Sequence, residues 1–88
     1  MPELSRFYGI VVAMFSEQGA KHKSPHVHVR YGSDKASYTL DGKVLAGHMP
    51  PTANKLVKEW LSVHKSELYK AWDASVQGEA PAKIEPLK

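Results

Sequence analysis

The sequence predicts an α+β fold, in which an antiparallel sheet of about four strands carries one long C-terminal helix on one face. Three observations support this prediction. Residues 26–31 alternate strictly between apolar and polar side chains, as a half-buried strand does. Two pairs of turn-forming residues, Gly32-Ser33 and Asp41-Gly42, separate further short segments of strand character. After Pro51, apolar residues recur at spacings of three and four, which is typical of an amphipathic helix.

The first predicted strand is the apolar run of residues 7–15, which is rich in β-branched and aromatic side chains. Because neither of its faces is polar, this strand is expected at the centre of the sheet. The polar segment 16–24 is expected to form a loop. The remaining strands are predicted at residues 26–31, 35–40 and 43–48.

The two turns also predict which strand residues lie opposite one another, provided that each turn has two residues. The expected pairs across the first turn include Arg30–Lys35, His28–Ser37 and Val27–Tyr38, and those across the second include Tyr38–Leu45, Ser37–Ala46 and Lys35–His48. The two registers agree on the faces. One face is apolar and carries Val27, Val29, Ala36, Tyr38 and Leu45. The other is polar and carries His26, His28, Arg30, Lys35, Ser37, Thr39 and His48.

The helix is predicted to begin near Pro51, with Thr52 as the N-cap residue, and to continue for about 25 residues. Its apolar stripe is Leu56, Val57, Trp60, Leu61, His64, Leu68, Trp72 and Val76. Gly78 fits the C′ position after the helix. Residues 1–88 are therefore interpreted as one domain, with a core of about residues 5–78 and an extended tail over 79–88. Because the helix covers one face only, the polar face is expected in solvent or at an interface.

The composition excludes several classes of function. The chain has 88 residues, no cysteine and a formal net charge of +3 with neutral histidines. Disulfides, zinc–thiolate sites and cysteine nucleophiles are therefore excluded. The small charge surplus permits nucleic-acid binding without requiring it. No segment approaches the ~20 apolar residues that span a bilayer, and the N-terminus lacks signal-peptide features, so we expect a cytoplasmic protein without membrane contact.

Residues 25–32 read Pro-His-x-His-x-x-Tyr-Gly, and this is the most specific of several segments that resemble the small bacterial domain of unknown function, family 4160. The others are residues 5–12, 42–47, 59–68 and 83–87, so the resemblance covers nearly the whole chain. Members often carry Phe where this chain has Val27, a change within an apolar position. The resemblance implies a partner protein encoded nearby, in a toxin–antitoxin-like pair, and leaves RNA or DNA open as a further partner. It assigns no catalytic residue.

The histidine-rich strand leaves three hypotheses open, and the leading one is a protein interface. An exposed edge strand and an overlong helix both invite pairing with a partner or with a second copy of the chain. The alternative is binding or cleavage of RNA by a polar surface made of His26, His28, Arg30, Lys35, Ser37 and His48. In that case His26 and His28 are the candidate catalytic residues, as a general base on a 2′-hydroxyl. The sequence favours a protein that is not an enzyme on its own.

The third hypothesis is a site for a divalent transition metal; no other cofactor is expected. Two histidines spaced two residues apart on one strand face can share a metal, and imidazole favours zinc, copper or nickel. The candidate ligands are His22, His26, His28 and His48. The competing interpretation is a row of solvated polar side chains. His64, within the helix stripe, is instead expected to be a partly buried histidine hydrogen-bonded to the sheet or a loop, and Trp60 and Trp72 are expected in the core.

Overall fold

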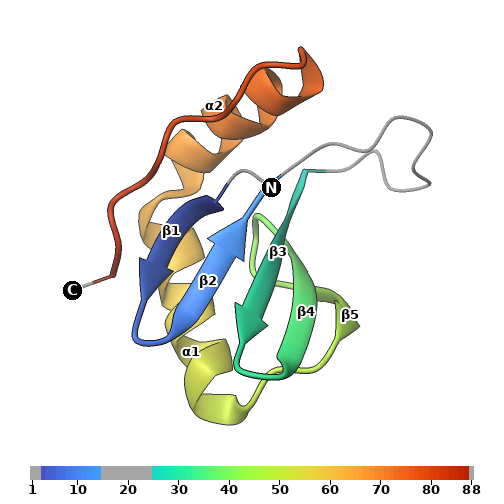
Figure 1. The fold of residues 1–88 in the computed structure, drawn as a ribbon, viewed down its shortest axis with the longest axis vertical. Coiled ribbons are helices and arrows are strands. Elements are labelled where there is room, and N and C mark those ends of the chain that lie inside the picture. The colour runs from blue at the N-terminus through green and yellow to red at the C-terminus, as the bar shows by residue number, and fades with distance from the viewer. Residues whose placement is uncertain (1–2, 15–24, 88) are drawn as a thin grey trace.

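The computed structural model describes residues 3–14 and 25–87, and these residues form a five-stranded antiparallel sheet and two helices (Figure 1). The strands lie in the order of the sequence: β1 (Glu3–Phe7), β2 (Ile10–Ala13), β3 (His26–Tyr31), β4 (Asp34–Thr39) and β5 (Val44–Gly47). The helices are α1 (Pro51–Val63) and α2 (Lys65–Val76). The predicted α+β class is confirmed, whereas the numbers of strands and helices differ from the prediction.

The fifth strand arises because the predicted first strand is a hairpin. The chain reverses at Tyr8 and Gly9, whose φ angles of 49° and 80° are the left-handed values of a two-residue type I′ turn. Phe7 consequently lies opposite Ile10 across the β1–β2 pair. The apolar run hid this turn because Tyr8 holds a position that Asn or Asp usually occupies. Phe15 and the predicted loop 16–24 lie outside the described residues.

The register between β3 and β4 is the predicted one. Arg30 lies opposite Lys35, and His28 lies opposite Ser37. Gly32 adopts a φ of 60°, as the two-residue turn requires. Val27, Val29, Ala36 and Tyr38 are therefore buried as expected, and the opposite face carries His28, Arg30, Lys35 and Ser37.

The register between β4 and β5 is only partly the predicted one. Ser37 lies opposite Ala46 as expected, but a bulge places Val44, and not Leu45, opposite Tyr38. The connection is longer than two residues because it spans 40–43, and Leu40 turns into the core. Backbone N–H groups at both ends close this loop: Thr39 donates to the carbonyl of Lys43, and Gly42 donates to that of Thr39. Leu45 is consequently exposed, which corrects its predicted place on the buried face.

The single long helix of the prediction is divided at His64. Its φ of −109° and ψ of 23° lie outside the helical range, so α1 ends at Val63 and α2 begins at Lys65. A straight helix would extend past the small sheet, whereas the break lets α2 bury Leu68 and Trp72. The start also differs from the prediction, because Pro50 is the N-cap residue and Thr52 lies inside the first turn.

The end of α2 matches the prediction for Gly78. This glycine follows the C-cap residue Gln77 with a φ of 83°, and the N–H of Glu79 donates to the carbonyl of Ala74. Together these features form a Schellman motif. Neither helix in the described part of the chain is long and apolar enough to cross a membrane.

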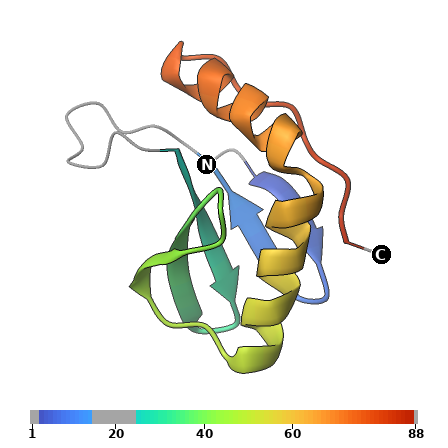
Figure 2. The ribbon, with the colours of Figure 1, turned by 180° about the vertical axis from the view of Figure 1, so that it is seen from behind.

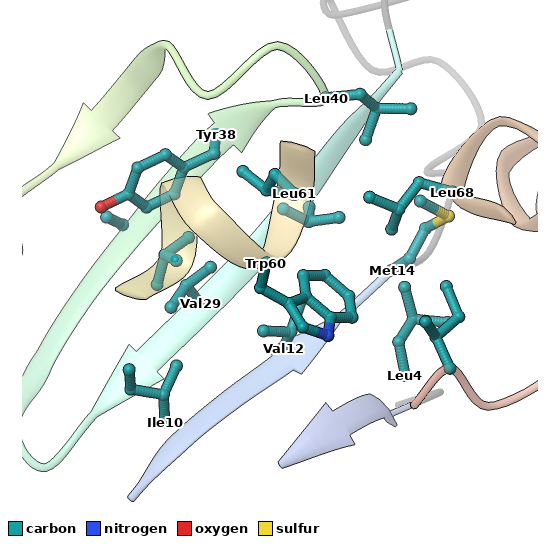
Figure 3. Packing of buried hydrophobic residues seen from close by; sticks show 14 of the residues in the cluster. Leu4, Ile10, Val12, Met14, Val29, Tyr38, Leu40, Trp60, Leu61 and Leu68 are labelled. Carbon is teal, nitrogen blue, oxygen red and sulfur yellow. The ribbon is translucent and has the colours of Figure 1, made fainter. Parts of the chain in front are cut away.

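The helices cover one face of the sheet, so the fold has two layers (Figure 2). Trp60 and Leu61 of α1 project onto the strands, where they meet Val12 and Val29, and Leu68 of α2 lies near Met14 and Leu4 (Figure 3). Trp60 and Trp72 are buried as predicted.

The C-terminal tail runs along the outer side of β1 (Figure 1). The N–H of Ile84 donates to the carbonyl of Leu4, and the indole N–H of Trp60 donates to the carbonyl of Glu85. The tail therefore covers the β1 edge of the sheet. The β5 edge is at the opposite side of the molecule, and its four residues are exposed.

We expect Gly47→Ala to destabilise the fold by more than about 2 kcal/mol, measured as the free energy of unfolding in urea. Gly47 has a φ of 83°, and a Cβ there would overlap the carbonyl oxygen of Lys35 on β4. Gly32→Ala is the matched control, because Gly32 also has a positive φ but has open space around its Cα. Its cost should stay near 1 kcal/mol. Equal costs for the two variants would contradict the contact with β4.

We expect Tyr38→Phe to destabilise the fold by about 1 kcal/mol at pH 7, because the phenol donates a 2.6 Å hydrogen bond to Oδ1 of Asn54. Burial raises the pKa of Tyr38 above its ordinary value. The unfolded chain therefore releases this proton first, and the wild type loses stability as the pH rises above about 10. The difference in the free energy of unfolding between wild type and Tyr38→Phe, measured in urea titrations, should shrink between pH 9 and 11. A constant difference would contradict the buried phenol.

Candidate functional site

The face of the sheet that the helices leave uncovered carries the polar side chains that the sequence singled out. The pairings place Val11 opposite Arg30 and Arg30 opposite Lys35, which makes one row across the strands. A neighbouring row is made by Ala13, His28, Ser37 and Ala46. Because alternate residues of a strand point to the same face, both rows face away from the core. We call the surface formed by these two rows the open face.

A hollow of about 480 Å³ lies on the open face. Its polar lining consists of His28, Arg30, Lys35 and Ser37, and its apolar side chains are Val11, Ala13 and Ala46, with Val29, Ala36 and Gly47 completing the lining. The hollow exists because Ala13, Ser37 and Ala46 are small, so that they leave space which longer side chains would fill. Four of the six residues of the predicted binding surface therefore line one concave site.

Two cations, Arg30 and Lys35, stand side by side at one end of this hollow. In the described ranges 3–14 and 25–87, neither Arg30 nor Lys35 forms an ion pair. The pKa of Glu3 is lowered mainly by its 2.7 Å hydrogen bond with Arg6, and the charge of Arg30 lowers it to a smaller extent. Like charges directly opposite on neighbouring strands repel each other. The site therefore holds positive charge that a bound anion would neutralise.

The centre of the hollow contains a histidine and a serine in contact. The Ser37 hydroxyl lies 3.4 Å from Nδ1 of His28, at the long end of hydrogen-bond distances. Both residues are half-buried. This pair offers a hydroxyl and an imidazole to a ligand beside two cations, which suits hydrogen bonding to a phosphate or to a polar ring.

His26 lies deeper than the sequence suggested. Only 8% of the residue is exposed, although its row was expected in solvent or at an interface. Its ring lies 5.1 Å from the ring of Trp72 on α2 and 5.1 Å from the ring of His28, measured between centroids. The physical reason is the break at His64, which brings α2 within reach of the start of β3. His26 therefore packs against the ring of His28 and is not among the residues that line the hollow.

The candidate metal ligands do not assemble within the described part of the chain. There, no three side chains of His, Cys, Asp or Glu lie close enough together to hold one ion. His26 and His28 are adjacent, as their spacing predicted, but His48 does not complete a group of three with them. His48 is instead exposed and donates its backbone N–H to the carbonyl of Lys35. His22 lies outside the described residues, so the metal hypothesis stays a prediction.

His64 is partly buried and hydrogen-bonded as the sequence indicated, but its partner lies in helix α2 and not in the sheet or a loop. It is half-buried, and its Nδ1 lies 2.8 Å from Oε1 of Glu67, where the ring N–H can donate to the carboxylate. Its ring also packs 5.5 Å from that of Trp60. These contacts belong to the junction of α1 and α2, and His64 is not among the residues that line the hollow.

Sequence reasoning missed the small apolar residues of the hollow. Val11 and Ala13 were assigned to a strand buried on both faces. Ala13 is buried as expected and Val11 is half-buried, but both line the hollow. Ala46 was correctly placed opposite Ser37, yet its small size was not weighed. The signal was available, because alanines beside polar residues on one strand face indicate a depression there.

Comparison with known families supports the resemblance seen in the sequence. Residues 9–73 match the family described as Domain of unknown function (DUF4160), which is most of the chain and includes the Pro-His-x-His-x-x-Tyr-Gly motif. Neither a curated protein nor a solved structure gave a match. The open face must therefore be interpreted from its own chemistry.

We expect Lys35→Glu to stabilise the isolated protein by a few tenths of a kcal/mol up to about 1 kcal/mol, because it replaces a repulsive pair with Arg30 by an attractive one. Thermal unfolding would show a higher midpoint at low salt. Added sodium chloride should raise the midpoint of the wild type more than that of Lys35→Glu, because salt screens the repulsion. A lower thermal midpoint for Lys35→Glu than for the wild type at low salt would contradict the repulsion between Arg30 and Lys35.

Proposed function

This chain belongs to the DUF4160 family, and we propose that it acts as a protein-interaction module of a toxin–antitoxin-like or regulatory gene pair. Its partner would be the small protein that the family resemblance implies is encoded nearby. The observation that carries the proposal is the uncovered edge of the sheet at β5. An exposed strand edge is a template for pairing with a strand of another chain.

The two edges of the sheet differ in how they are protected. The tail covers β1 through the bond from Ile84 to Leu4, whereas β5 is paired with β4 alone within the described ranges 3–14 and 25–87. The exposed fractions of Val44 and Leu45 on β5 are 45% and 40%. No charged residue lies within β5, although natural edge strands commonly carry one against unwanted pairing.

The backbone of β5 can accept a further strand. The N–H of His48 points toward β4, where it donates to Lys35. N–H groups alternate in direction along an antiparallel strand, so that of Gly47 points outward. The bulge at Leu45 interrupts this alternation. Beyond it the carbonyl of Lys43 faces β4, where it accepts from Thr39, so the N–H of Val44 points outward as well. A partner strand with apolar side chains would pair with these groups and cover Val44 and Leu45.

We expect Leu45→Lys to disrupt co-purification with the product of the neighbouring gene, and to weaken the affinity at least about tenfold in isothermal titration. The new charge would oppose burial of the edge without touching the core. Val63→Lys is the matched control, because Val63 is 65% exposed on α1, away from β5. The complex should resist added salt, since apolar burial and backbone bonds hold it. Full binding by Leu45→Lys would refute the role of β5.

A second candidate function is binding of single-stranded RNA by the open face. The specific observation in its favour is that Arg30 and Lys35 stand without an ion pair, among the described residues, beside the hydroxyl and imidazole of Ser37 and His28. Arginine and lysine bind phosphates, and serine and histidine can add hydrogen bonds. RNA cleavage would in addition require His28 to act as a general base on a 2′-hydroxyl.

We expect the lone chain to bind single-stranded RNA with an affinity that falls steeply with salt, because phosphate binding releases counterions. Arg30→Ala should weaken binding and lower the salt slope by about one unit. Lys70→Ala is the control, since Lys70 is exposed on α2. Fluorescence anisotropy at several salt concentrations measures both quantities. Salt-independent binding, or an unchanged slope in Arg30→Ala, would count against this function, and cleavage lost in His28→Ala would identify a ribonuclease.

A further inference from the structure

We propose that the hollow on the open face binds one nucleotide, with its phosphate between Arg30 and Lys35 and its base beside His28. This inference rests on the second candidate function above and names the ligand unit that the site accepts. The nucleotide can be a free nucleoside monophosphate or one unit of a single-stranded RNA, because both present the same phosphate and base. The hollow's shape, charge and row spacing each support this ligand.

The size of the hollow suits a small ligand. Its volume of about 480 Å³ lies within the range of roughly 300–1,000 Å³ found for small-molecule sites. Such sites combine an apolar lining with a few polar groups that fix orientation. Here Val11, Ala13 and Ala46 supply apolar side chains, and the polar groups gather at one end and in the centre.

The charge of the hollow selects an anionic group. Arg30 and Lys35 are cross-strand neighbours, so one phosphate can contact both side chains at once. Arginine can offer two parallel N–H donors to phosphate oxygens, and lysine adds a compact charge. Binding would also relieve the repulsion between the two cations. A ligand without the phosphate loses these contacts and should bind far more weakly.

The spacing of the two rows fits the rest of the nucleotide. Residues two apart on a strand are about 6.6 Å apart, so the row of His28 lies about one ribose length from the row of Arg30. A base placed there would lie over Ala46, whose short side chain is exposed and leaves room. The imidazole of His28 can stack against a base, and the Ser37 hydroxyl can hydrogen-bond its edge. A flat ring suits this shallow site better than a flexible acyl chain does.

The test titrates the full chain, labelled with ¹⁵N, with each of the four nucleoside monophosphates, with adenosine, with inorganic phosphate and with a short single-stranded oligoribonucleotide. We expect at least one monophosphate to bind with a Kd below about 1 mM. Its binding should shift the amide signals of Ala13, His28, Ser37 and Ala46. Adenosine and inorganic phosphate should each bind at least about tenfold more weakly than that nucleotide.

Three variants locate the ligand in the hollow. Lys35→Ala should weaken nucleotide binding about tenfold, because it removes a charged phosphate contact. Ala46→Leu fills the hollow without changing any charge, and it should abolish binding of the mononucleotide. Lys70→Ala should bind as the wild type does. Amide spectra of each free variant show whether its fold is intact, and Lys35→Ala tests the site even where Ala46→Leu disturbs β5.

The outcomes separate this inference from the RNA function. If RNA binds but no monophosphate binds below about 1 mM, the nucleotide site is refuted while RNA binding by the face stands. If a monophosphate binds and the oligoribonucleotide does not, the site is a free-nucleotide site and the RNA function fails. Unchanged nucleotide binding in a folded Ala46→Leu, or in Lys35→Ala, would also overturn the proposal.

Discussion

Alternation of side chains along β3 is the constraint on which the rest of the structure depends. Val27 and Val29 are buried under the helices, which commits His28 and Arg30 to the opposite face. A shift of one residue would turn the guanidinium of Arg30 into the core, where an unpaired charge costs several kcal/mol. Since the two helices cover one face only, the core residues of β3 also determine which polar residues form the open face.

The open face keeps features that do not favour stability. Arg30 and Lys35 repel each other across the strands, and the small residues Ala13 and Ala46 leave a hollow that larger side chains could fill. Natural sequences retain such local conflicts mainly where a ligand or partner resolves them. The repulsion and the unfilled space occur together at the hollow. We therefore place the ligand there and not elsewhere on the polar surface.

Local signals predicted the parts of the fold that depend on neighbouring residues. The Gly32-Ser33 turn fixed the β3–β4 register and with it the contact between His28 and Ser37. The hairpin at Tyr8-Gly9 was not predicted because an apolar residue holds a turn position there, and the β2 residue of each row of the open face was missed as well. The burial of His26 could not be predicted, because it depends on a helix break that brings Trp72 onto the sheet.

The two proposed functions share residues, and this has a consequence for how they would act together. Ala46 and Gly47 line the hollow and also belong to β5, the edge at which a partner strand would pair. A strand added there would extend the wall of the hollow beside Ala46 and enlarge the surface that a nucleotide contacts. By thermodynamic linkage, a partner that improves nucleotide binding must itself bind more tightly to the nucleotide-bound chain. A partner whose side chains enter the hollow would instead exclude the nucleotide, so one edge strand could make the two ligands either cooperative or mutually exclusive.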